Sequence, residues 1–253
     1  MSRYWDDDTI YSQPSAEELR AKANESVRRA GKKGQSYEPV TCRSRRGEIC
    51  ESWWGQAWCE NLEKYADYAS RLDRGKGYVR SGAVIDLQIS SGRVEAKVQG
   101  RRKTPYKVEI RIGRLKEEDC QRIIDRCTSR IESLETLANG DFPEELKDIF
   151  TERGGLFPSP NEISFSCSCP DWAMMCKHVA AVMYGIGLRF DNNPFYFFTL
   201  RGIDPDRFIG VALQNSVEKM LANADKGSDR IIDEGSITEL FGVLLYSTRR
   251  RLL

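Results

Sequence analysis

Residues 161–190 read NEISFSCSCPDWAMMCKHVAAVMYGIGLRF. Cys167 and Cys169 form a Cys-x-Cys pair in this stretch, and six residues further on Cys176 and His178 form a Cys-x-His pair. His178 is the only histidine among the 253 residues of the chain. Three thiolates and one imidazole are the ligand set of a closed, tetrahedral zinc site. We therefore predict one structural Zn²⁺ per chain, bound by these four side chains.

The residues around the two ligand pairs predict a strand, a turn and a helix. Apolar and polar residues alternate from 162 to 167, which is typical of a strand, and Pro170 and Asp171 then turn the chain. The apolar run that begins at Val179 is long enough for a buried helix. Cys176 and His178 would then lie at the first turn of that helix, where the positive end of its dipole favours thiolate over thiol.

Two other interpretations of this stretch are open. Cys167 and Cys169 could form a redox-active or disulfide pair, and His178 could be an ordinary core residue. Neither explains why four ligand-type side chains fall within twelve residues. The other five cysteines are scattered along the chain, and we expect them to be ordinary thiols: Cys42, Cys50, Cys59, Cys120 and Cys127.

The clearest secondary structure upstream is a sheet. Three segments, at 84–90, 93–99 and 108–112, alternate apolar and polar residues with the period of a strand. Their short connections predict an antiparallel meander with one apolar face, which helices must cover. One cover is a helix that begins after Ser52 and packs through Trp54 and Trp58, although a tryptophan-rich helix could also stack bases. The other is an amphipathic helix from about 120 to 134.

The predicted fold class is α+β. A three-stranded antiparallel meander covered by helices is followed by a small zinc-bound β-hairpin and helix finger and by a helical C-terminal region. We expect four parts: a loosely ordered basic and polar arm (1–45), the α+β domain (46–160), the finger with its aromatic segment (161–202) and the helical region (203–253). A helix after residue 236 could dock on a partner, but folding back on its own domain is slightly favoured. Loss of the metal is expected to melt residues 165–190 and to leave the sheet folded.

Charge is balanced overall at +1 but is unevenly distributed, because a basic segment (71–116) precedes an acidic one (117–162). The order of strands in a meander brings two basic segments to the same end of the sheet. Their candidate nucleic-acid contacts are Arg74, Lys76, Tyr78, Arg80, Arg101, Arg102, Lys103, Tyr106 and Lys107. The cations would bind phosphates by counterion release, the tyrosines could stack on bases, and Gly75, Gly77 and Gly100 would admit a phosphate close to the backbone. The alternative is that this end pairs with the acidic helices.

The motif Cys-x-Cys…Cys-x-His resembles the SWIM-type zinc finger of bacterial proteins, and the flanking sequence CSCPDWAMMCKHVAAVMY resembles those members closely. Further similar stretches are Trp53–Trp58, Arg74–Gly82, Val98–Gly100 and Thr104–Tyr106, so the resemblance covers about residues 45–205. It implies a non-enzymatic zinc protein that binds DNA or protein and is often found alongside Snf-type helicase-like ATPases.

These observations favour an interaction protein over an enzyme. A zinc hydrolase needs an open metal position and a base, whereas four protein ligands close the site and the chain has no second histidine. A thiol redox protein remains a separate possibility, which zinc content would distinguish. We expect non-specific DNA binding, service as an accessory partner of a helicase-like ATPase, or both; the alternative is a purely protein–protein adaptor with structural zinc. Eight cysteines without a signal peptide or a membrane-spanning apolar run favour the bacterial cytosol or nucleoid, and no small-molecule substrate or membrane partner is expected.

Overall fold

The computed structural model describes residues 14–130 and 146–224. The described residues up to 212 belong to one compact unit, and the described residues from 213 onward belong to a second. The predicted helix after residue 236 lies outside the described residues. In chain order the elements are α1 (Ala16–Gly31), α2 (Trp53–Glu63), α3 (Ala69–Arg80), β1 (Val84–Ser90), β2 (Arg93–Val98), β3 (Tyr106–Ile112), α4 (Glu117–Arg130), α6 (Asp148–Thr151), the 3-10 turn η2 (Pro160–Glu162), β4 (Ile163–Cys167), α7 (Lys177–Asn192), α8 (Phe195–Arg201) and α9 (Pro205–Ala224).

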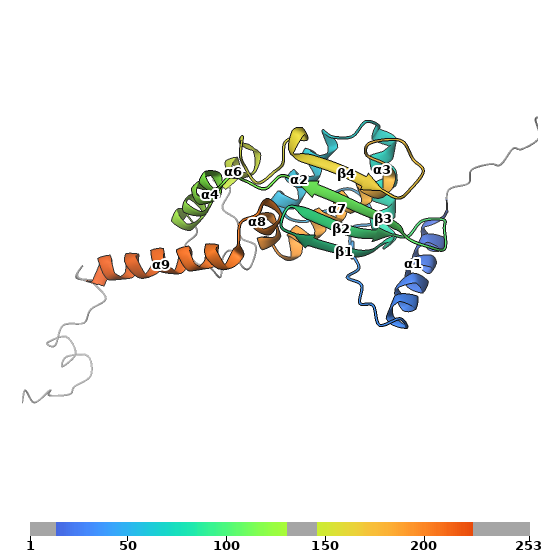
Figure 1. Ribbon diagram of the computed structural model, residues 1–253, viewed down its shortest axis with the longest axis horizontal. Helices are drawn as coiled ribbons and strands as arrows, with labels where there is room; N and C mark the ends of the chain where they lie inside the picture. Colours follow the sequence, from blue (N-terminus) through green and yellow to red (C-terminus); the bar gives the residue numbers. More distant parts are fainter. Residues whose placement is uncertain (1–13, 131–145, 225–253) are drawn as a thin grey trace, which may run out of the picture. The chain divides into compact units, whose positions relative to one another are not determined.

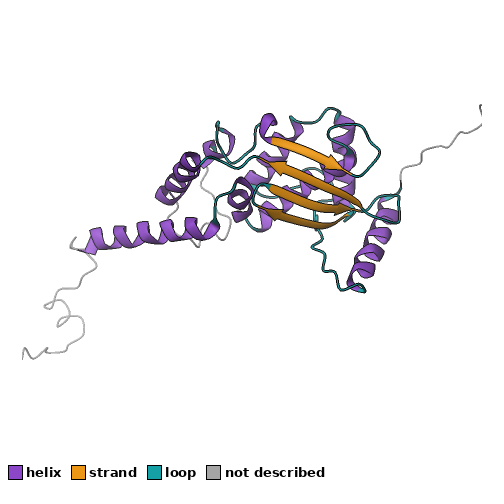
Figure 2. Ribbon diagram, in the orientation of Figure 1, coloured by secondary structure: helices purple, strands orange, loops and turns teal. Residues whose placement is uncertain are grey.

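The sheet has four antiparallel strands in the order β1-β2-β3-β4 (Figures 1 and 2). The predicted meander of β1, β2 and β3 is confirmed, but a three-stranded sheet was wrong by one strand. The strand that leads into the Cys-x-Cys pair is the fourth, because Ile110 pairs with Phe165 and Val108 with Cys167. The candidate metal site therefore grows out of the main sheet rather than out of a separate hairpin.

Alternation sets which face of the sheet is buried. Val94, Ala96 and Val98 of β2 are buried, whereas Arg93 and Glu95, which alternate with them, are exposed. The turn from β1 to β2 uses Gly92, whose φ of 73° is a left-handed conformation that glycine adopts without strain. The apolar side chains of β2 and β3 therefore share one face of the sheet, as the alternation in the sequence predicts.

Helix α7 covers that apolar face and is the centre of the core. It contacts each of the four strands as well as α2 and α3, and it runs behind the sheet in Figure 2. Twelve of its residues are buried, from His178 to Phe190. Small residues let its neighbours approach: a Cβ on Gly75 of α3 would lie 2.6 Å from the Cβ of Ala180. The predicted helix with Cys176 and His178 at its start is confirmed.

The tryptophan helix is also confirmed as a packing element. Ser52 caps α2 by accepting a hydrogen bond from the Gly55 N–H. Trp58 is 1% exposed, donates from Nε1 to the Met183 carbonyl of α7 at 2.9 Å, and packs edge-on against Phe157 and Phe190. Such an enclosed indole cannot stack on a base, so its role is to hold α2 on α7.

The described part of the N-terminal segment differs from the expected loose arm. Ser15 and Glu18 form a capping box at the start of α1. Leu19, Ala23 and Ala30 are buried on one side of this helix, which matches a possible short helix at 16–30 that the sequence indicates within the arm. The segment after it runs beside β1, where the Val40 N–H donates to the Val84 carbonyl. The arm is thus part of the first unit from residue 14 onward.

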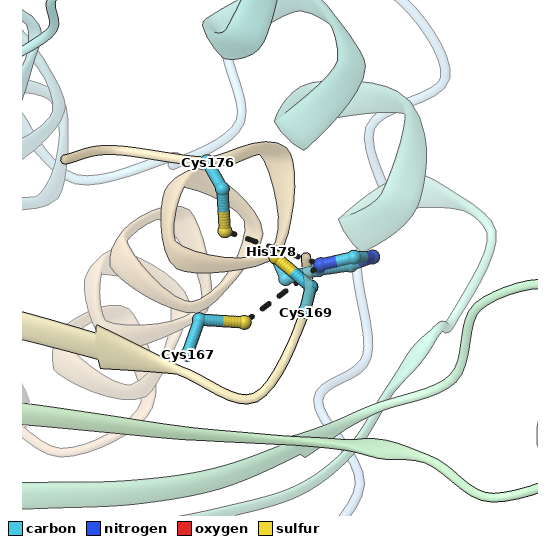
Figure 3. A group of neighbouring side chains, drawn as sticks. All are labelled: Cys167, Cys169, Cys176 and His178. Atoms are coloured by element: carbon cyan, nitrogen blue, oxygen red, sulfur yellow. Dashed lines mark hydrogen bonds between the residues drawn. The ribbon is translucent and has the colours of Figure 1, made fainter. Parts of the chain in front are cut away.

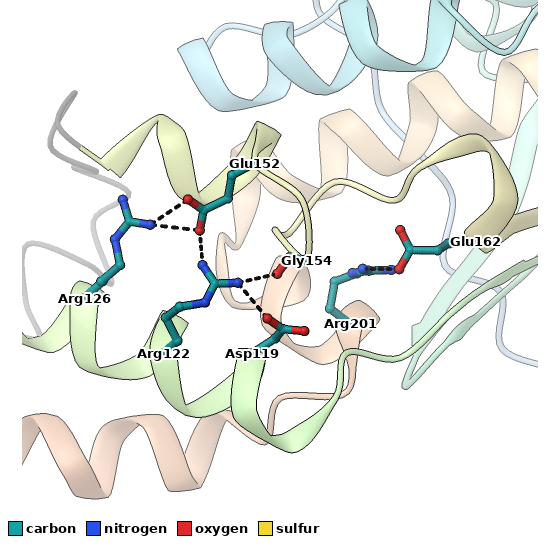
Figure 4. A network of polar contacts seen from close by, with 7 residues as sticks. All are labelled: Asp119, Arg122, Arg126, Glu152, Gly154, Glu162 and Arg201. Atoms are coloured by element: carbon teal, nitrogen blue, oxygen red, sulfur yellow. Dashed lines mark hydrogen bonds and ion pairs between the residues drawn. The ribbon is translucent and has the colours of Figure 1, made fainter.

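The acidic segment engages arginines of its own neighbourhood. Glu152 accepts hydrogen bonds from Arg122 and Arg126 of α4, as Figure 4 shows. In the same figure Arg201, whose side chain is fully buried, donates to Glu162 at 2.7 Å. Cys120, Ile123, Ile124 and Cys127 form the buried face of α4, as predicted. The positions predicted beyond residue 130 lie outside the described residues.

The aromatic segment forms α8, and its rings pack in the core. Phe197 stacks on Phe190 of α7 with ring centroids 3.7 Å apart, and Phe198 packs on Phe208 at 4.8 Å. Phe197 and Phe198 are about 1% exposed or less, so these two rings are core residues and cannot stack on a base. Among the described residues, no helix is both long enough and apolar enough to pass through a bilayer.

Candidate metal centre and the adjoining basic hollow

The four candidate ligands come from the end of β4 and the start of α7. Cys167 is the last residue of β4 and faces the same side as Val108, so its side chain points toward α7. Cys169 follows two residues later. The residue between the two cysteines, Ser168, is held to β3 because its N–H donates to the Lys107 carbonyl. Cys176 is the N-cap of α7, and His178 lies in its first turn. Sheet pairing and helix capping thus bring the Cys-x-Cys and Cys-x-His pairs together.

The ligand atoms converge on one point, as Figure 3 shows. One ligand atom of each of the four residues lies within 4.8 Å of all the others. Nδ1 of His178 is 3.8 Å from Sγ of Cys167 and 4.0 Å from Sγ of Cys176. A tetrahedral zinc with Zn–S near 2.3 Å and Zn–N near 2.1 Å would hold neighbouring ligand atoms roughly 3.6–3.8 Å apart. The cluster therefore fits a tetrahedral metal that is bound through Nδ1.

The protein environment also prepares one thiolate. The S–H of Cys167, followed by His178 and the Val179 N–H of α7, lowers the pKa of Cys176 to about 3. The pKa of Cys167 is raised, first through its hydrogen bond to Cys176 and then by burial. Burial also raises the pKa of Cys169. A bound metal ion would supply the positive charge needed to deprotonate all three thiols.

Two tyrosines fix the imidazole ring of His178. Tyr106 stacks on it with centroids 4.3 Å apart, and Tyr78 packs edge-on at 5.3 Å. The side chain is 2% exposed. Its Nε2 lies on the side away from the sulfurs and is buried without a hydrogen-bond partner among the described residues. Because a ligand histidine keeps its proton on the other nitrogen, Nε2 would be a donor that still needs an acceptor.

The loop between the two ligand pairs is tied to α3. The Asp171 carboxylate accepts hydrogen bonds from Arg71 at 3.1 Å and from the Ala173 N–H at 3.3 Å. The Met174 N–H donates to Asp67 at 2.9 Å. These contacts define the path of the six residues that separate Cys169 from Cys176.

A hollow of about 470 Å³ opens beside the candidate metal centre, and we call it the basic hollow. It is lined by residues of α3, the β2–β3 loop and the start of α7: Pro14, Arg74, Tyr78, Arg101, Arg102, Tyr106, Cys169, Pro170, Asp171, Lys177 and His178. Four of these are cations, and Asp171, the one carboxylate that the described residues place in the lining, is engaged by Arg71. Burial raises the pKa of Tyr78 to about 12, so its phenol stays protonated and available as a donor.

Five of the nine predicted nucleic-acid contacts line the basic hollow, and four do not. Lys76 pairs with Glu63 at 3.0 Å, and Arg80 donates to the Gly47 carbonyl. Lys103 lines a different hollow together with α1, and Lys107 lies on the open face of the sheet. No secondary structure was predicted for residues 74–80, which form the second half of α3. In a helix, Arg74 and Tyr78 share a face because they are four residues apart, and positions 76 and 80 point elsewhere.

The predicted role of the glycines was also wrong for Gly75. Its bare Cα lets α3 pack against Ala180 of α7 and does not face a phosphate site. Gly100 lies under the site, since a Cβ there would be 2.6 Å from the Tyr106 ring and 3.4 Å from Nε2 of His178. Gly77 has open space around it. Gly75 therefore allows α3 to pack closely on α7, and Gly100 allows the Tyr106 ring to pack closely on the backbone.

Helix α1 holds the β2–β3 loop in place. The buried Gln99 accepts from Ser26 at 2.6 Å and donates to the carbonyls of Gly100 and Arg102. Lys22 donates to the Arg101 carbonyl at 3.3 Å. The loop that carries Arg101 and Arg102 therefore has its backbone fixed from both sides.

Sequence reasoning did not assign Lys177 to the basic hollow. It lies between two candidate ligands, Cys176 and His178, and it lines the same hollow as Arg74 and Arg102. Its position between Cys176 and His178 was the sequence signal that could have identified it.

The five other cysteines are free thiols. Two of them, Cys50 and Cys59, are buried with their sulfurs 3.6 Å apart.

The chain is similar to the uncharacterized protein Rv2102 of Mycobacterium tuberculosis, with 37% identity over 165 residues. The similarity covers 64% of this chain and 59% of that protein, so the chain spans less than two thirds of the relative's length. No family model matches the chain. No solved structure matches it. The name of this relative states no function.

Proposed function

We propose that this chain is a zinc-organised binding protein that contacts nucleic acid through the basic hollow. The observation that carries the proposal is the position of Arg74, Arg101, Arg102 and Lys177 around one hollow beside the ligand cluster. Guanidinium and ammonium groups bind phosphates by releasing condensed counterions, without reading the base sequence. The resemblance to SWIM-type zinc fingers supports the same proposal. We place the protein in a reducing cytosol, where its thiols stay free to bind metal.

The zinc in this proposal is structural and the protein is not an enzyme. Cys167, Cys169, Cys176 and His178 would fill all four positions of a tetrahedral ion, so no position is left for water or a substrate. The metal would instead join the end of β4 to the start of α7. Through His178 it would also fix the ring on which Tyr106 stacks, and thus one wall of the basic hollow.

The charge of the site favours an external anion. A Zn²⁺ ion with three thiolates carries one net negative charge, which a single cation can balance. Four cations line the basic hollow, and Asp171, the carboxylate that the described residues contribute to its lining, is paired with Arg71. An anion in the hollow would in addition bring an acceptor toward Nε2 of His178, which has none among the described residues.

Reversal of two charges in the basic hollow tests this function. The double variant Arg101→Glu/Arg102→Glu is expected to weaken binding of a fluorescent 20-nucleotide DNA about 10- to 100-fold at low salt. It should also reduce the slope of log affinity against log salt by about 1.5, since two phosphate contacts are lost. Fluorescence anisotropy across a salt series measures both quantities.

Lys103→Glu is the matched control, because it makes the same change one residue further along the same loop but outside the basic hollow. It should alter affinity less than threefold. Zinc content and melting temperature should be unchanged in both variants. Equal losses in the control and in the double variant would place the contact elsewhere, and undetectable binding by the wild-type protein would refute the function.

We further propose that the protein serves a helicase-like ATPase as an accessory partner, and that the contact involves α9. Helix α9 exposes large apolar side chains on one face, which are 53–73% exposed: Leu213, Val217, Met220 and Leu221. A stripe of this kind is typical of a helix that binds in an apolar groove. This observation also favours the adaptor alternative, in which protein binding alone is the function.

The ATPase proposal predicts a loss of co-purification. Val217→Asp with Met220→Asp should remove the ATPase from a nuclease-treated pull-down, because two charges would have to be buried in the groove. Asn215→Asp, on the side of α9 opposite the apolar stripe, should retain it. Retention of the ATPase by the double variant, or its loss on nuclease treatment of the wild type, would refute a direct contact through this face.

A further inference from the structure

The loop between the two ligand pairs carries exposed apolar side chains. Trp172 is 79% exposed and Met174 is 72% exposed. Both lie in the six-residue loop whose backbone and Asp171 side chain are held by hydrogen bonds. Tyr68 is 45% exposed and packs edge-on against the Trp172 ring, with centroids 5.8 Å apart. We call Tyr68 and Trp172 the aromatic platform. Large exposed rings next to each other on a protein surface are uncommon and mark binding sites.

The backbone under the aromatic platform is fixed. Asp171, the residue before Trp172, is held by Arg71 of α3 and by the Ala173 N–H. The Met174 N–H, two residues after Trp172, donates to Asp67. Tyr68 is itself the N-cap residue of α3. The two rings are therefore presented to solvent by a supported surface, and stacking on them costs little ordering entropy.

The aromatic platform adjoins the basic hollow through two connections. Pro170 and Asp171 line the hollow, and Trp172 is the next residue in the chain. Tyr68 begins α3, whose Arg74 and Tyr78 line the hollow one and a half to three turns further along. At 1.5 Å per residue, Tyr68 and Arg74 are about 9 Å apart along the helix axis. Phosphate-binding cations and stacking rings thus lie within the span of a few nucleotides.

From this juxtaposition we propose that the nucleic acid is single-stranded and that a base stacks on Trp172 while neighbouring phosphates occupy the basic hollow. The inference rests on the proposed function and adds the class of nucleic acid. Cations alone bind a duplex and a single strand alike, but only unpaired bases offer their faces to an exposed indole. Bases inside a duplex are stacked on each other, so the platform has nothing to bind there. The charge of the hollow favours a polyanion over a neutral apolar peptide as the occupant of this surface.

The test compares Trp172→Ala and Trp172→Phe with the wild-type, zinc-loaded protein on a labelled 12-nucleotide single strand and its matched duplex. Trp172→Ala is expected to weaken single-strand binding about 5- to 100-fold, the cost of one lost base stack. Duplex binding should change less than twofold, and the salt slope should not change, since no phosphate contact is lost. Trp172→Phe, which keeps a ring, should recover most of the affinity. Because the side chain is exposed, melting temperature and zinc content should stay those of the wild type.

The outcomes separate this inference from the proposed function. If the wild-type protein binds neither oligonucleotide, the proposed function fails and this inference fails with it. If it binds both and Trp172→Ala changes neither, the basic hollow acts alone and the aromatic platform is not a base site. An equal loss on single strand and duplex contradicts the stated preference. If Trp172→Ala leaves DNA binding unchanged and removes a protein partner, the platform is a protein-docking surface and the inference is overturned.

Discussion

Removal of the metal by a chelator is expected to lower the melting temperature of the first unit by at least about 10 °C. Structural zinc contributes roughly 10–16 kcal/mol of binding free energy in isolated fingers at neutral pH. A loss of only a third of that amount corresponds to about 10 °C or more in a unit of this size. His178→Ala should have the same effect without a chelator, because His178 supplies one ligand and is buried between Tyr78 and Tyr106.

The structure also changes which part of the protein is expected to unfold when the metal is lost. On sequence grounds, residues 165–190 would unfold alone and the sheet would survive. However, β4 is a strand of that sheet, and α7 contacts all four strands together with α2 and α3. A metal bound by the four candidate ligands would join β4 to α7, so its loss should destabilise the sheet and the finger in one cooperative transition. Circular dichroism for helix content and tryptophan fluorescence for α2 should give the same midpoint.

Cys42→Ser is the control for thiol loss outside the cluster, because Cys42 is a partly exposed free cysteine far along the chain from the ligand pairs. It should keep the wild-type zinc content and melting temperature. Addition of zinc after chelation should restore the original midpoint. Two separate transitions would favour the independent finger, and an unchanged midpoint in metal-depleted protein would contradict a structural role for the metal.

Trp58→Ala should lower the free energy of unfolding by about 4 kcal/mol. Truncation of a fully buried tryptophan costs about 3–5 kcal/mol through lost burial and the cavity left behind. The carbonyl of Met183 would also lose its donor inside the core. Urea denaturation, followed by circular dichroism, measures the change.

Trp58→Phe separates the two contributions of this side chain. The phenyl ring keeps most of the packing against Phe157 and Phe190 but lacks the indole N–H, so a loss of about 1–2 kcal/mol is expected. DNA affinity should be unchanged in both variants at temperatures where they are folded. A stable Trp58→Ala variant with weakened DNA binding would show instead that α2 contacts nucleic acid.

The sequence predicted the elements whose signals are local. Alternation at 84–90, 93–99 and 108–112 identified β1, β2 and β3, and Ser52 correctly marked the start of α2. The spacing of Cys167, Cys169, Cys176 and His178 identified four side chains that the fold brings together. Each of these predictions depends on residues close in the chain, where period, capping and ligand spacing act directly.

What the sequence did not predict depends on distant packing. The pairing of β4 with β3 joins segments that are separated by about 50 residues, and alternation alone does not name a strand's partner. Helix α3 was missed because Gly75, Gly77 and many charges disfavour an isolated helix. The packing of Gly75 on Ala180 overrides that local preference. Because α3 is a helix, Arg74 and Tyr78 line the same hollow as Arg101 and Arg102. Lys76 and Arg80 lie on other sides of the helix and contact Glu63 and Gly47 instead.

The candidate metal centre and the binding surfaces form one local structure. His178 lies between the cluster and the basic hollow, and the loop that links the ligand pairs carries Trp172. Metal binding would therefore position both surfaces at once, since it fixes the His178 ring and the two ends of that loop. A protein without metal should lose DNA affinity together with stability, whereas the Trp172 and Arg101/Arg102 variants should lose affinity alone.

X-ray absorption at the zinc edge of freshly purified protein tests the central claim most directly. The account predicts one zinc per chain, with three sulfur neighbours at about 2.3 Å and one nitrogen neighbour at about 2.0–2.1 Å. In Cys176→Ser, the spectrum should lose one sulfur neighbour or the zinc altogether. Protein that is folded and free of zinc, or a zinc surrounded mainly by oxygen, would contradict the account.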